Sequence, residues 1–370
     1  MRLWLKRHER DSIKTVPFLN SQICEIELGL KVCIQAKKEF QYRNTRMSLK
    51  QRGIHMQKVE QYSKSVLDNI SKVIVGKEEV IKLLLTAMLA DGHVVLEDMP
   101  GTGKTRLAKS LAASLNSDFK RIQFTPDLLP SDVTGMNVFN RKNGEFELRK
   151  GPVFTNVLLA DEINRATPRT QAGLLESMEE RQVTIDGETY ALESPFFVIA
   201  TQNPIETAGT YPLPEAQLDR FMMCLSVGLP SKEEELAILE RFMKEDPFEK
   251  LKPVLEPEML VGMKETIKEV FVHPEIEKYM VEIVSETRKK DRVIMGASPR
   301  AALALLRACK AYAALFGRNY CIPDDVKTLA VPVLAHRLKL SYGYGQGLES
   351  KEVIREILEE IPAPTEEFTR

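Results

Sequence analysis

The sequence predicts an α/β fold, in which a central parallel sheet is covered by helices on both faces and is followed by a smaller all-α domain. Short apolar runs such as Val157–Ala160 and Phe196–Ala200 alternate with amphipathic helical segments in the first part of the chain. Continuous apolar runs of this length are typical of parallel strands that are buried on both faces. From Ser231 onward the periodic segments are helical, and many have proline in the first turn, where helices accept it.

Composition limits the classes of protein to which the chain can belong. Its 370 residues suffice for two domains with sizeable cores, and 43% apolar with 28% charged residues is ordinary for a globular protein. The net charge of −1 gives no overall attraction to nucleic acid or to a membrane. No apolar run is long enough to span a bilayer, and the five cysteines have no C-x-x-C spacing. We therefore expect a cytoplasmic protein without membrane insertion, disulfides or a zinc site.

Residues 1–55 are a basic N-terminal extension, with twelve Lys/Arg against five Asp/Glu and no motif. The stretch before Met56 resembles a translated ribosome-binding site. One hypothesis is that the native chain starts at Met56 and that the extension is upstream or poorly ordered sequence; a genuine family-specific extension is the alternative. The remaining chain divides into an α/β core, 56–229, and a helical domain, 230–370, which Ser231 begins as a helix cap.

The elements around the first strand follow from apolar spacing. This spacing predicts one helix over Val59–Val73 and another over Glu78–Ala90, with Gly76 between them. The apolar run His93–Leu96 is then expected to be a buried strand, and the segment Arg106–Leu115 has the spacing of a helix. A strand, a glycine loop and a helix in this order form the context of a P-loop.

The loop between that strand and that helix carries residues suited to binding phosphate. Gly101 and Gly103 allow backbone N–H groups to close around phosphate oxygens, and the helix N-terminus adds its dipole. Lys104 can reach the β- and γ-phosphates, and the Thr105 hydroxyl can ligate Mg²⁺. The P-loop motif is G-x-x-x-x-G-K-[ST], and Asp98 stands where this motif has its first glycine. The Asp98 carboxylate must therefore point away from the nucleotide or be held by the loop.

Two acids follow the apolar run that ends at Ala160. At the carboxyl edge of a parallel sheet, Asp161 could hold Mg²⁺ and Glu162 could orient or deprotonate an attacking water. The alternative is that both acids stabilise the start of the helix that begins near Thr167. Asn203, after the next strand, could contact the γ-phosphate or the water, although a turn-forming asparagine before proline explains it equally well when taken alone.

The other core elements follow from alternation, helical spacing and turn signals. Phe119–Phe124 alternates as a strand does, and Asp127–Gly135 has the composition of a loop. Asn143-Gly144 and Asp186-Gly187 each lie between alternating runs and predict two hairpins. The remaining predicted elements are helices over Thr170–Glu180, Pro214–Phe221, Lys232–Lys244, Pro257–Val270, Pro274–Lys289, Pro299–Leu315, Pro323–Leu338 and Glu349–Ile361, and a strand over Met222–Val227.

An arginine begins one helix of the second domain. Ser298 caps that helix, and this places Arg300 in its first turn. A cation at this position opposes the helix dipole, which favours a binding role for Arg300 over a place on a solvated face.

Five motifs in register make the chain similar to one known family. They are MPGTGKT (Met99–Thr105), LLADEINRA (Leu158–Ala166), IATQNP (Ile199–Pro204), LPEAQLDRF (Leu213–Phe221) and GASPRA (Gly296–Ala301). In order and spacing they resemble the MoxR-type AAA+ ATPases, a clade with an insert around the second helix. The resemblance extends from Val59 to Ile361 and implies a P-loop AAA+ core followed by an all-α lid domain.

The resemblance also implies a role for individual residues. Asp161 and Glu162 would form Walker B, Asn203 would be sensor 1, Arg220 would be the arginine finger that reaches a neighbouring subunit, and Arg300 would be sensor 2 on the lid. The two hairpins would be the helix-2 insert and the pre-sensor-1 hairpin. The implied nucleotide-binding residues are Ile74, Val75 and Gly76 against adenine, and Pro100, Gly101, Thr102, Gly103, Lys104, Thr105 and Arg106 in and directly after Walker A.

A member of this family would hydrolyse ATP with Mg²⁺ at the subunit interfaces of a ring, which the family suggests is a hexamer. It would remodel or help to mature a client protein, and a von Willebrand factor A domain protein is a plausible partner. A nucleotide-dependent binding switch with little turnover is the alternative function. A DNA-acting motor is less favoured, because residues 56–370 carry a net charge of −8 and no DNA-binding module is recognisable.

Overall fold

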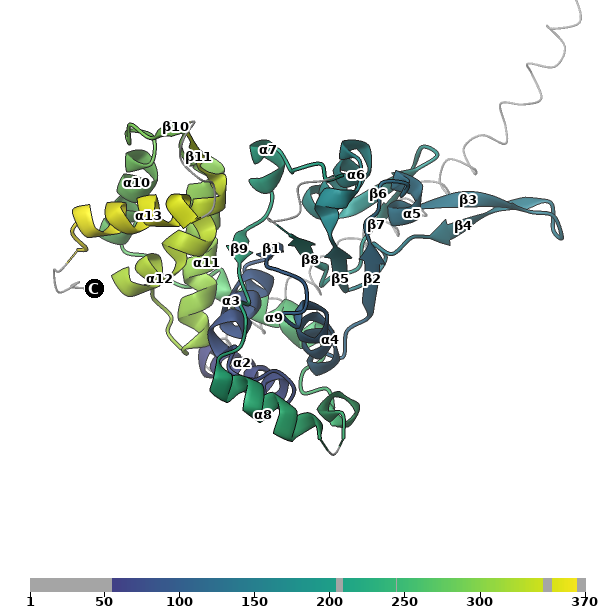
Figure 1. Ribbon diagram of the computed structural model, residues 1–370, viewed down its shortest axis with the longest axis horizontal. Helices are drawn as coiled ribbons and strands as arrows, with labels where there is room; N and C mark the ends of the chain where they lie inside the picture. The colour runs from purple at the N-terminus through teal and green to yellow at the C-terminus, as the bar shows by residue number, and fades with distance from the viewer. Residues whose placement is uncertain (1–54, 204–208, 244, 342–347, 365–370) are drawn as a thin grey trace, which may run out of the picture. The chain divides into compact units, whose positions relative to one another are not determined.

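The computed structural model describes residues 55–203, 209–243, 245–341 and 348–364. The predictions for residues 1–54, and for Pro204 of the expected turn, lie outside these described residues. Residues from Met56 onward form one compact unit, in which a sheet is enclosed by helices and a group of helices follows at one side (Figure 1).

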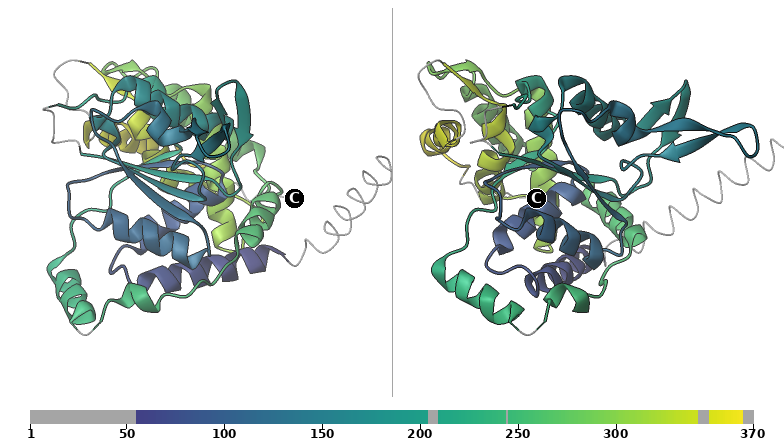
Figure 2. Two further views of the ribbon diagram at one scale, coloured as in Figure 1. Left: turned by 90° about the vertical axis from the view of Figure 1, so that its right-hand side faces the viewer. Right: turned by 45° about the vertical axis from the view of Figure 1, so that its right-hand side comes forward.

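The central sheet has five parallel strands in the order β2-β5-β8-β1-β9. Figure 2 shows this sheet edge-on between its helical layers. Strands β1, β2 and β5 match the predicted runs to within one residue at each end, β8 extends two residues beyond its predicted end, and β9 is shorter than the predicted strand Met222–Val227 at both ends. The strands are β1 (Val94–Glu97), β2 (Phe119–Gln123), β5 (Val157–Asp161), β8 (Phe197–Gln202) and β9 (Met223–Leu225).

Helices cover both faces of the sheet, as the apolar strands require. Val94 and Leu96 of β1 belong to one apolar cluster with α2 (His55–Ser71), α3 (Glu78–Leu89) and α4 (Lys104–Ser114). Val95, between them, belongs to a second cluster. Successive side chains of a strand point to opposite faces, so each strand contributes to both clusters. The second cluster contains residues of α6 (Pro168–Glu180), and the predicted αβα sandwich is therefore confirmed.

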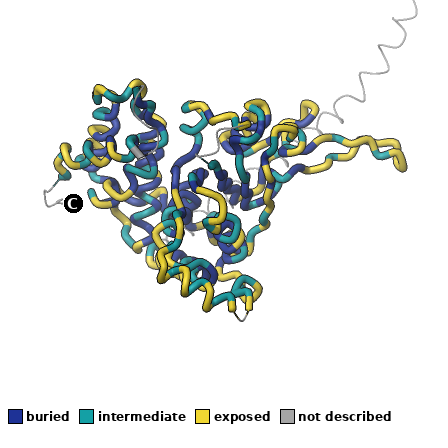
Figure 3. The backbone as a smooth tube through the Cα atoms, viewed as in Figure 1, coloured by how far each residue is buried: buried dark blue, intermediate teal, exposed yellow. Residues whose placement is uncertain are grey.

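Both predicted hairpins are present. The first pairs β3 (Gly135–Asn140) with β4 (Glu145–Lys150), and the second pairs β6 (Gln182–Ile185) with β7 (Glu188–Ala191). The first projects away from the sheet and is largely exposed along its length (Figures 1 and 3). The prediction of a plain loop before it was wrong, because residues 130–134 form the short helix α5, in which Val133 is buried.

The second part of the chain is helical, and Ser231 caps its first helix through a capping box with Glu234. A two-stranded sheet also joins the lid helices, and the sequence did not predict it, because strands of two or three residues leave no periodic signal. The elements of the chain not yet named are α7 (Glu215–Leu218), α8 (Lys232–Phe242), α9 (Pro257–Ile267), α10 (Pro274–Glu286), β10 (Val293–Met295), α11 (Pro299–Leu315), α12 (Pro323–Leu334), β11 (Lys339–Leu340) and α13 (Leu348–Glu360), with 3₁₀ turns at Ile163–Arg165, Pro247–Lys250 and Ala335–Arg337. Of these, α7 and the turn Ile163–Arg165 belong to the first part of the chain.

One apolar cluster continues from the sheet into the lid helices, and includes residues from α9 to α13. The boundary between residues 229 and 230 therefore stays a prediction. Within the described residues, no helix is both long and apolar enough to cross a membrane. Cys224, Cys309 and Cys321 are buried free thiols.

His93 is a buried histidine directly before β1. Its Nδ1 accepts the N–H of Val198 at 3.0 Å, and its Nε2 lies 3.1 Å from the Met178 carbonyl, so the neutral ring links β8 to α6. Burial is the main reason that the pKa of His93 falls from 6.5 to about 3. Because this pKa is lower in the folded state than in the unfolded state, the unfolded chain binds the proton more readily as the pH falls.

We therefore expect the free energy of unfolding to fall as the pH is lowered from 6.5 towards about 3, and His93 to account for part of that slope. Each such histidine can contribute up to about 1.4 kcal/mol per pH unit. Chemical denaturation at a series of pH values, with His93→Gln as the variant, measures this contribution. Glutamine can keep both hydrogen bonds but does not titrate, so an equal pH slope in the variant and the natural protein would contradict the assignment.

Candidate functional site

A cavity of about 770 Å³ lies at the carboxyl edge of the sheet, beside the glycine loop. It brings together the loop, the acids after β5 and the polar end of β8. The predicted residues that line it are Pro100, Gly101, Gly103, Lys104, Thr105, Arg106, Asp161, Glu162 and Asn203.

The loop is open towards this cavity. Gly101 and Gly103 have φ angles of 89° and 87°, in a region that L-residues with side chains rarely adopt, and Gly103 is the residue before the first turn of α4. Among the described residues, no atom lies within 4 Å of where a Cβ would project from either glycine. The backbone N–H groups at the start of α4 are thus available to an anion.

Lys104 is held inside the loop. Its Nζ donates a hydrogen bond to the Asp98 carbonyl oxygen at 2.9 Å. Burial lowers the pKa of Lys104, while the carboxylates of Asp98, Asp161 and Glu162 act in the opposite direction. An anion that entered the cavity would offer this ammonium group a stronger partner than a carbonyl.

Asp161 is fixed by two neighbours. The Thr201 hydroxyl donates to Oδ1 at 2.6 Å, and the Arg121 guanidinium donates to Oδ2 at 2.7 Å. Thr201 also accepts the backbone N–H of Glu162 at 2.9 Å, so a single hydroxyl contacts the Asp161 carboxylate and the backbone of Glu162. The sequence analysis did not identify Thr201 or Arg121. The alternation of β2, which puts residues 121 and 123 on one face, is the signal that could have found Arg121.

Glu162 has a backbone φ of 55°, which is uncommon for a residue other than glycine. Its carboxylate accepts a hydrogen bond from Gln123 at 2.6 Å and forms an ion pair with Arg165 at 3.0 Å. The side chain is therefore kept in the cavity and does not cap α6, whose N-cap position is Thr167. This geometry disfavours the capping alternative for Glu162.

The cavity suits a magnesium ion that is shared with phosphate. Among the described residues, no group of three or more His, Cys, Asp or Glu could hold a metal by itself. Mg²⁺ in phosphate sites commonly takes one or two protein oxygens and completes its shell with phosphate and water. Thr105 and Asp161 line the same cavity and offer oxygens of this kind.

Some predicted nucleotide-binding residues lie elsewhere. Ile74, Val75, Gly76 and Thr102 are not among the residues that line this cavity in the described structure. Gly76 is in close contact with the Glu234 side chain at the start of α8. Their roles stay predictions.

The cavity has a wall that the sequence analysis did not identify. The Arg106 guanidinium pairs with both carboxylate oxygens of Asp246, at 2.9 and 2.7 Å, and lies over the rings of Phe242 and Phe248. Asp246 and Phe248 line the cavity. No sequence motif marks them, since their contacts with Arg106 span about 140 residues of the chain.

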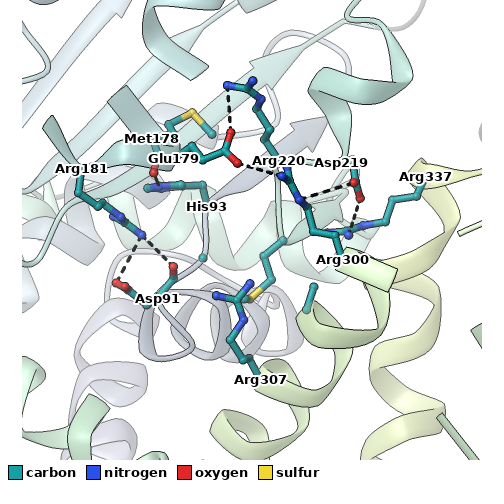
Figure 4. Close-up of a pocket in the computed structure, with 13 residues that line it drawn as sticks. Asp91, His93, Met178, Glu179, Arg181, Asp219, Arg220, Arg300, Arg307 and Arg337 are labelled. Atoms are coloured by element: carbon teal, nitrogen blue, oxygen red, sulfur yellow. Dashed lines mark hydrogen bonds and ion pairs between the residues drawn. The ribbon is translucent and has the colours of Figure 1, made fainter. Parts of the chain in front are cut away.

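Arg220 and Arg300 line a different cavity, of about 340 Å³ (Figure 4). Both are paired with Glu179 of α6, at 3.3 Å for Arg220 and 2.9 Å for Arg300. Asp219 accepts a 2.7 Å hydrogen bond from Arg337 and lies 4.0 Å from Arg300. Five arginines and three acids line the cavity, which gives it an excess of positive charge: Arg181, Arg220, Arg300, Arg307 and Arg337 against Asp91, Glu179 and Asp219.

The structure thus separates the residues with predicted catalytic, metal-binding and sensor roles into two groups. Lys104, Thr105, Asp161, Glu162 and Asn203 share the first cavity. Arg220 and Arg300, predicted as the arginine finger and as sensor 2, share the second. Whether Arg300 binds nucleotide stays a prediction.

Asp98 is not among the residues that line the cavity beside the glycine loop. It accepts hydrogen bonds from the Ser226 hydroxyl at 2.6 Å and from the N–H groups of Val227 and Gly228 at 2.8 and 3.0 Å. Its carboxylate is therefore held by the segment that follows β9.

Comparisons with known proteins agree with this architecture. Residues 93–223 match the "ATPase family associated with various cellular activities (AAA)", and residues 285–361 match the AAA lid domain. The uncharacterised protein YeaC of Bacillus subtilis is 50% identical over 301 residues, which cover 81% of this chain and 94% of YeaC. Chaperone MoxR1 of Mycobacterium tuberculosis is 41% identical over 305 residues, with 80% of each chain covered. A crystal structure of a candidate ATPase from Cytophaga hutchinsonii has a TM-score of 0.79 and 39% identity, and covers 86% of this chain and 100% of its own.

The contacts of Thr201 lead to a testable expectation. Thr201→Val removes the hydroxyl that donates to the Asp161 carboxylate and leaves the Glu162 N–H without its partner. We expect the Mg²⁺ concentration needed for half-maximal nucleotide binding or turnover to rise about 10- to 100-fold, as for other partners of metal ligands. A Mg²⁺ titration at fixed ATP measures it.

Thr86→Val is the matched control. Thr86 is a buried threonine of α3 whose hydroxyl bonds to a carbonyl of its own helix, Lys82, at 2.8 Å. The Mg²⁺ requirement of this control should not change. An equal shift in both variants would show that the effect arises from loss of stability and not from the site.

Proposed function

We propose a function from the premise that the chain belongs to the MoxR family of AAA+ ATPases. In this proposal the protein hydrolyses ATP at the subunit interfaces of a ring and uses the cycle to remodel or mature a client protein. The observation that carries this proposal is the single cavity shared by the glycine loop, Asp161, Glu162 and Asn203. These residues come from three parallel strands, and their positions suit a triphosphate whose terminal phosphate lies near the acids.

Each group in this cavity has a chemical role in the proposal. The N–H groups of the loop and Lys104 bind the phosphates, and Lys104 exchanges the Asp98 carbonyl for the β- and γ-phosphates. Glu162 orients the attacking water, and Asn203 contacts the γ-phosphate or that water. Thr105 and Asp161 would hold Mg²⁺, which neutralises charge on the phosphates when it is bound.

The position of the arginines supports the proposed ring. Arg220 lies with Arg300 in a cavity that the phosphate loop does not line, which fits a role towards the nucleotide of a neighbouring subunit. Because Arg300 binds the same carboxylate, Glu179, we extend this role to Arg300. Each subunit then supplies the phosphate loop to one site and its arginines to the next, an arrangement that closes into a ring, here proposed to be a hexamer.

The partner is proposed by class. The similarity to Chaperone MoxR1 supports a client protein, and a protein with a von Willebrand factor A domain stays a proposal. The second candidate is an ATP-dependent binding switch with little turnover. The joint presence of Lys104, Glu162 and Asn203 in one cavity favours hydrolysis over that switch. We place the protein in the cytoplasm and propose no nucleic-acid partner.

The proposed action of Arg220 on the nucleotide of a neighbouring subunit, here called its trans role, gives a specific expectation. Arg220→Ala should reduce turnover by about 10³-fold or more, the range known for arginine fingers, while ATP binding changes little. Steady-state ATPase rates and binding of a fluorescent ATP analogue measure the two effects. Arg292→Ala is the control, because Arg292 is also ion-paired and partly exposed but does not line either cavity in the described structure. Normal turnover in Arg220→Ala would refute the trans role.

The variant Glu162→Gln serves both to test ATP hydrolysis and to capture the client protein. The amide keeps the size of the side chain but cannot act as a base, so ATP should bind and turnover should fall by about 10²–10⁴-fold. Affinity capture with ATP and this variant should retain a client that Lys104→Ala, which cannot bind ATP tightly, releases. Partner-independent binding of ATP with no turnover in the natural protein would instead support the switch.

A further inference from the structure

Asp98 is a buried carboxylate at the first position of the phosphate loop, and its side chain is only 6% exposed. A buried charge is costly unless it is paired or fully hydrogen-bonded. Here it is satisfied by three donors from one short segment, Ser226–Gly228, which lies 128–130 residues away in the chain. The carboxylate therefore ties the phosphate loop to this segment.

The same residue has a second contact through its backbone. Its carbonyl oxygen accepts the Lys104 ammonium at 2.9 Å. The backbone carbonyl of Asp98 thus binds the Lys104 ammonium, while the side-chain carboxylate of Asp98 binds Ser226–Gly228. Any change in the partner of Lys104 acts directly on the peptide group that the carboxylate anchors.

The tethered segment leads to other parts of the predicted nucleotide site. It continues through Leu229 to Ser231, the cap of α8. Lys77, which follows the predicted adenine-binding residue Gly76, donates to the Leu229 carbonyl at 3.1 Å and to Glu234 at 3.3 Å. A path of hydrogen bonds and short backbone segments therefore runs from Lys104 through Asp98 to the start of α8.

We propose that Asp98 is a positioning residue, which holds the phosphate loop against Ser226–Gly228 and transmits the release of Lys104 upon ATP binding to the start of α8. The proposal rests on the proposed ATPase function. When phosphate draws the Lys104 ammonium away, the Asp98 carbonyl loses its partner, and the tether carries the resulting shift of residue 98 into the segment beyond β9.

Two simpler accounts predict different results. If Asp98 merely repelled phosphate, neutralising it would lower the KM for ATP and leave kcat unchanged or higher. If it were merely structural, its loss would lower the melting temperature without altering the kinetics. Asp98→Gly, which creates the glycine that phosphate loops usually have, would then be neutral or beneficial to turnover.

The experiment uses the full chain with Asp98→Asn and Asp98→Gly. Asparagine has nearly the same volume, but its amide N–H₂ faces a backbone N–H donor, so the three hydrogen bonds cannot all persist. We expect kcat to fall about tenfold or more in both variants, as the loss of a hydrogen bond to a charged group implies. We also expect the exchange of the Val227 and Gly228 amide hydrogens to respond to a non-hydrolysable ATP analogue in the natural protein and not in the variants.

Asp325→Asn is the matched control. Asp325 is a buried carboxylate of α12, 2% exposed, and accepts hydrogen bonds from Arg318 and from the Ile322 N–H. This control should lower the melting temperature and leave kcat, KM and the exchange response unchanged.

The outcomes separate this proposal from the proposed function. If the natural protein has no ATPase activity, the proposed function is contradicted. The amide exchange of Val227 and Gly228 in response to a bound ATP analogue then still tests the contact between Asp98 and Ser226–Gly228. Active natural protein together with unchanged kcat in Asp98→Asn, or with an exchange response that persists in that variant, overturns the role of Asp98 alone. A lower KM with undiminished kcat would overturn it in favour of simple repulsion.

Discussion

The parallel pairing of β1, β5 and β8 is the constraint on which the candidate site depends. The register sets Ala160 against Ala200 and Leu96 against Thr201, so Asp161 and Thr201 meet at one edge of the sheet beside the loop that follows β1. In a strand, a slip of one residue turns every side chain to the opposite face. Burial on both faces fixes this register, because Val157–Ala160 and Phe197–Ala200 are fully covered by the two apolar clusters. The position of the acids is thus a consequence of core packing.

Charged groups in both cavities are held by partners within the same subunit. Arg121 pairs with Asp161, and Glu179 pairs with both Arg220 and Arg300. Ion pairs of this kind contribute little to stability when they are partly exposed. Their more useful effect is to keep each side chain in one orientation before a ligand arrives, so less ordering remains to be done on binding.

The separation of the two cavities gives a physical reason for assembly. A single subunit holds the phosphate-binding groups in one place and an excess of arginines in another. In the proposal, the first place binds the triphosphate, and the arginines of the second add cations that would stabilise charge developing during phosphoryl transfer. In the proposed ring each interface joins the two halves, and the carboxylate of Glu179 is then exchanged for phosphate as the partner of the arginines.

The sequence by itself determined the elements whose signals are local. Buried strands, the glycine loop with its open cradle, the two hairpins and the Ser231 cap all follow from spacing or turn chemistry within about ten residues, and the structure confirms them. The described structure differs where an element is too short for a period, as in α5 and the β10–β11 sheet, and where an element ends before its predicted boundary, as in α12 and β9.

Only the tertiary structure decided which side chains meet. It placed Arg121 and Thr201 on Asp161, set Arg300 beside Arg220, and gave the Asp98 carboxylate its donors 128–130 residues away. A motif reports the chemistry of a position along the chain, whereas a buried charge is satisfied by whichever donors the packed fold brings to it. That is why the sequence could require the Asp98 carboxylate to be held away from phosphate, while the packing around β9 decided what holds it.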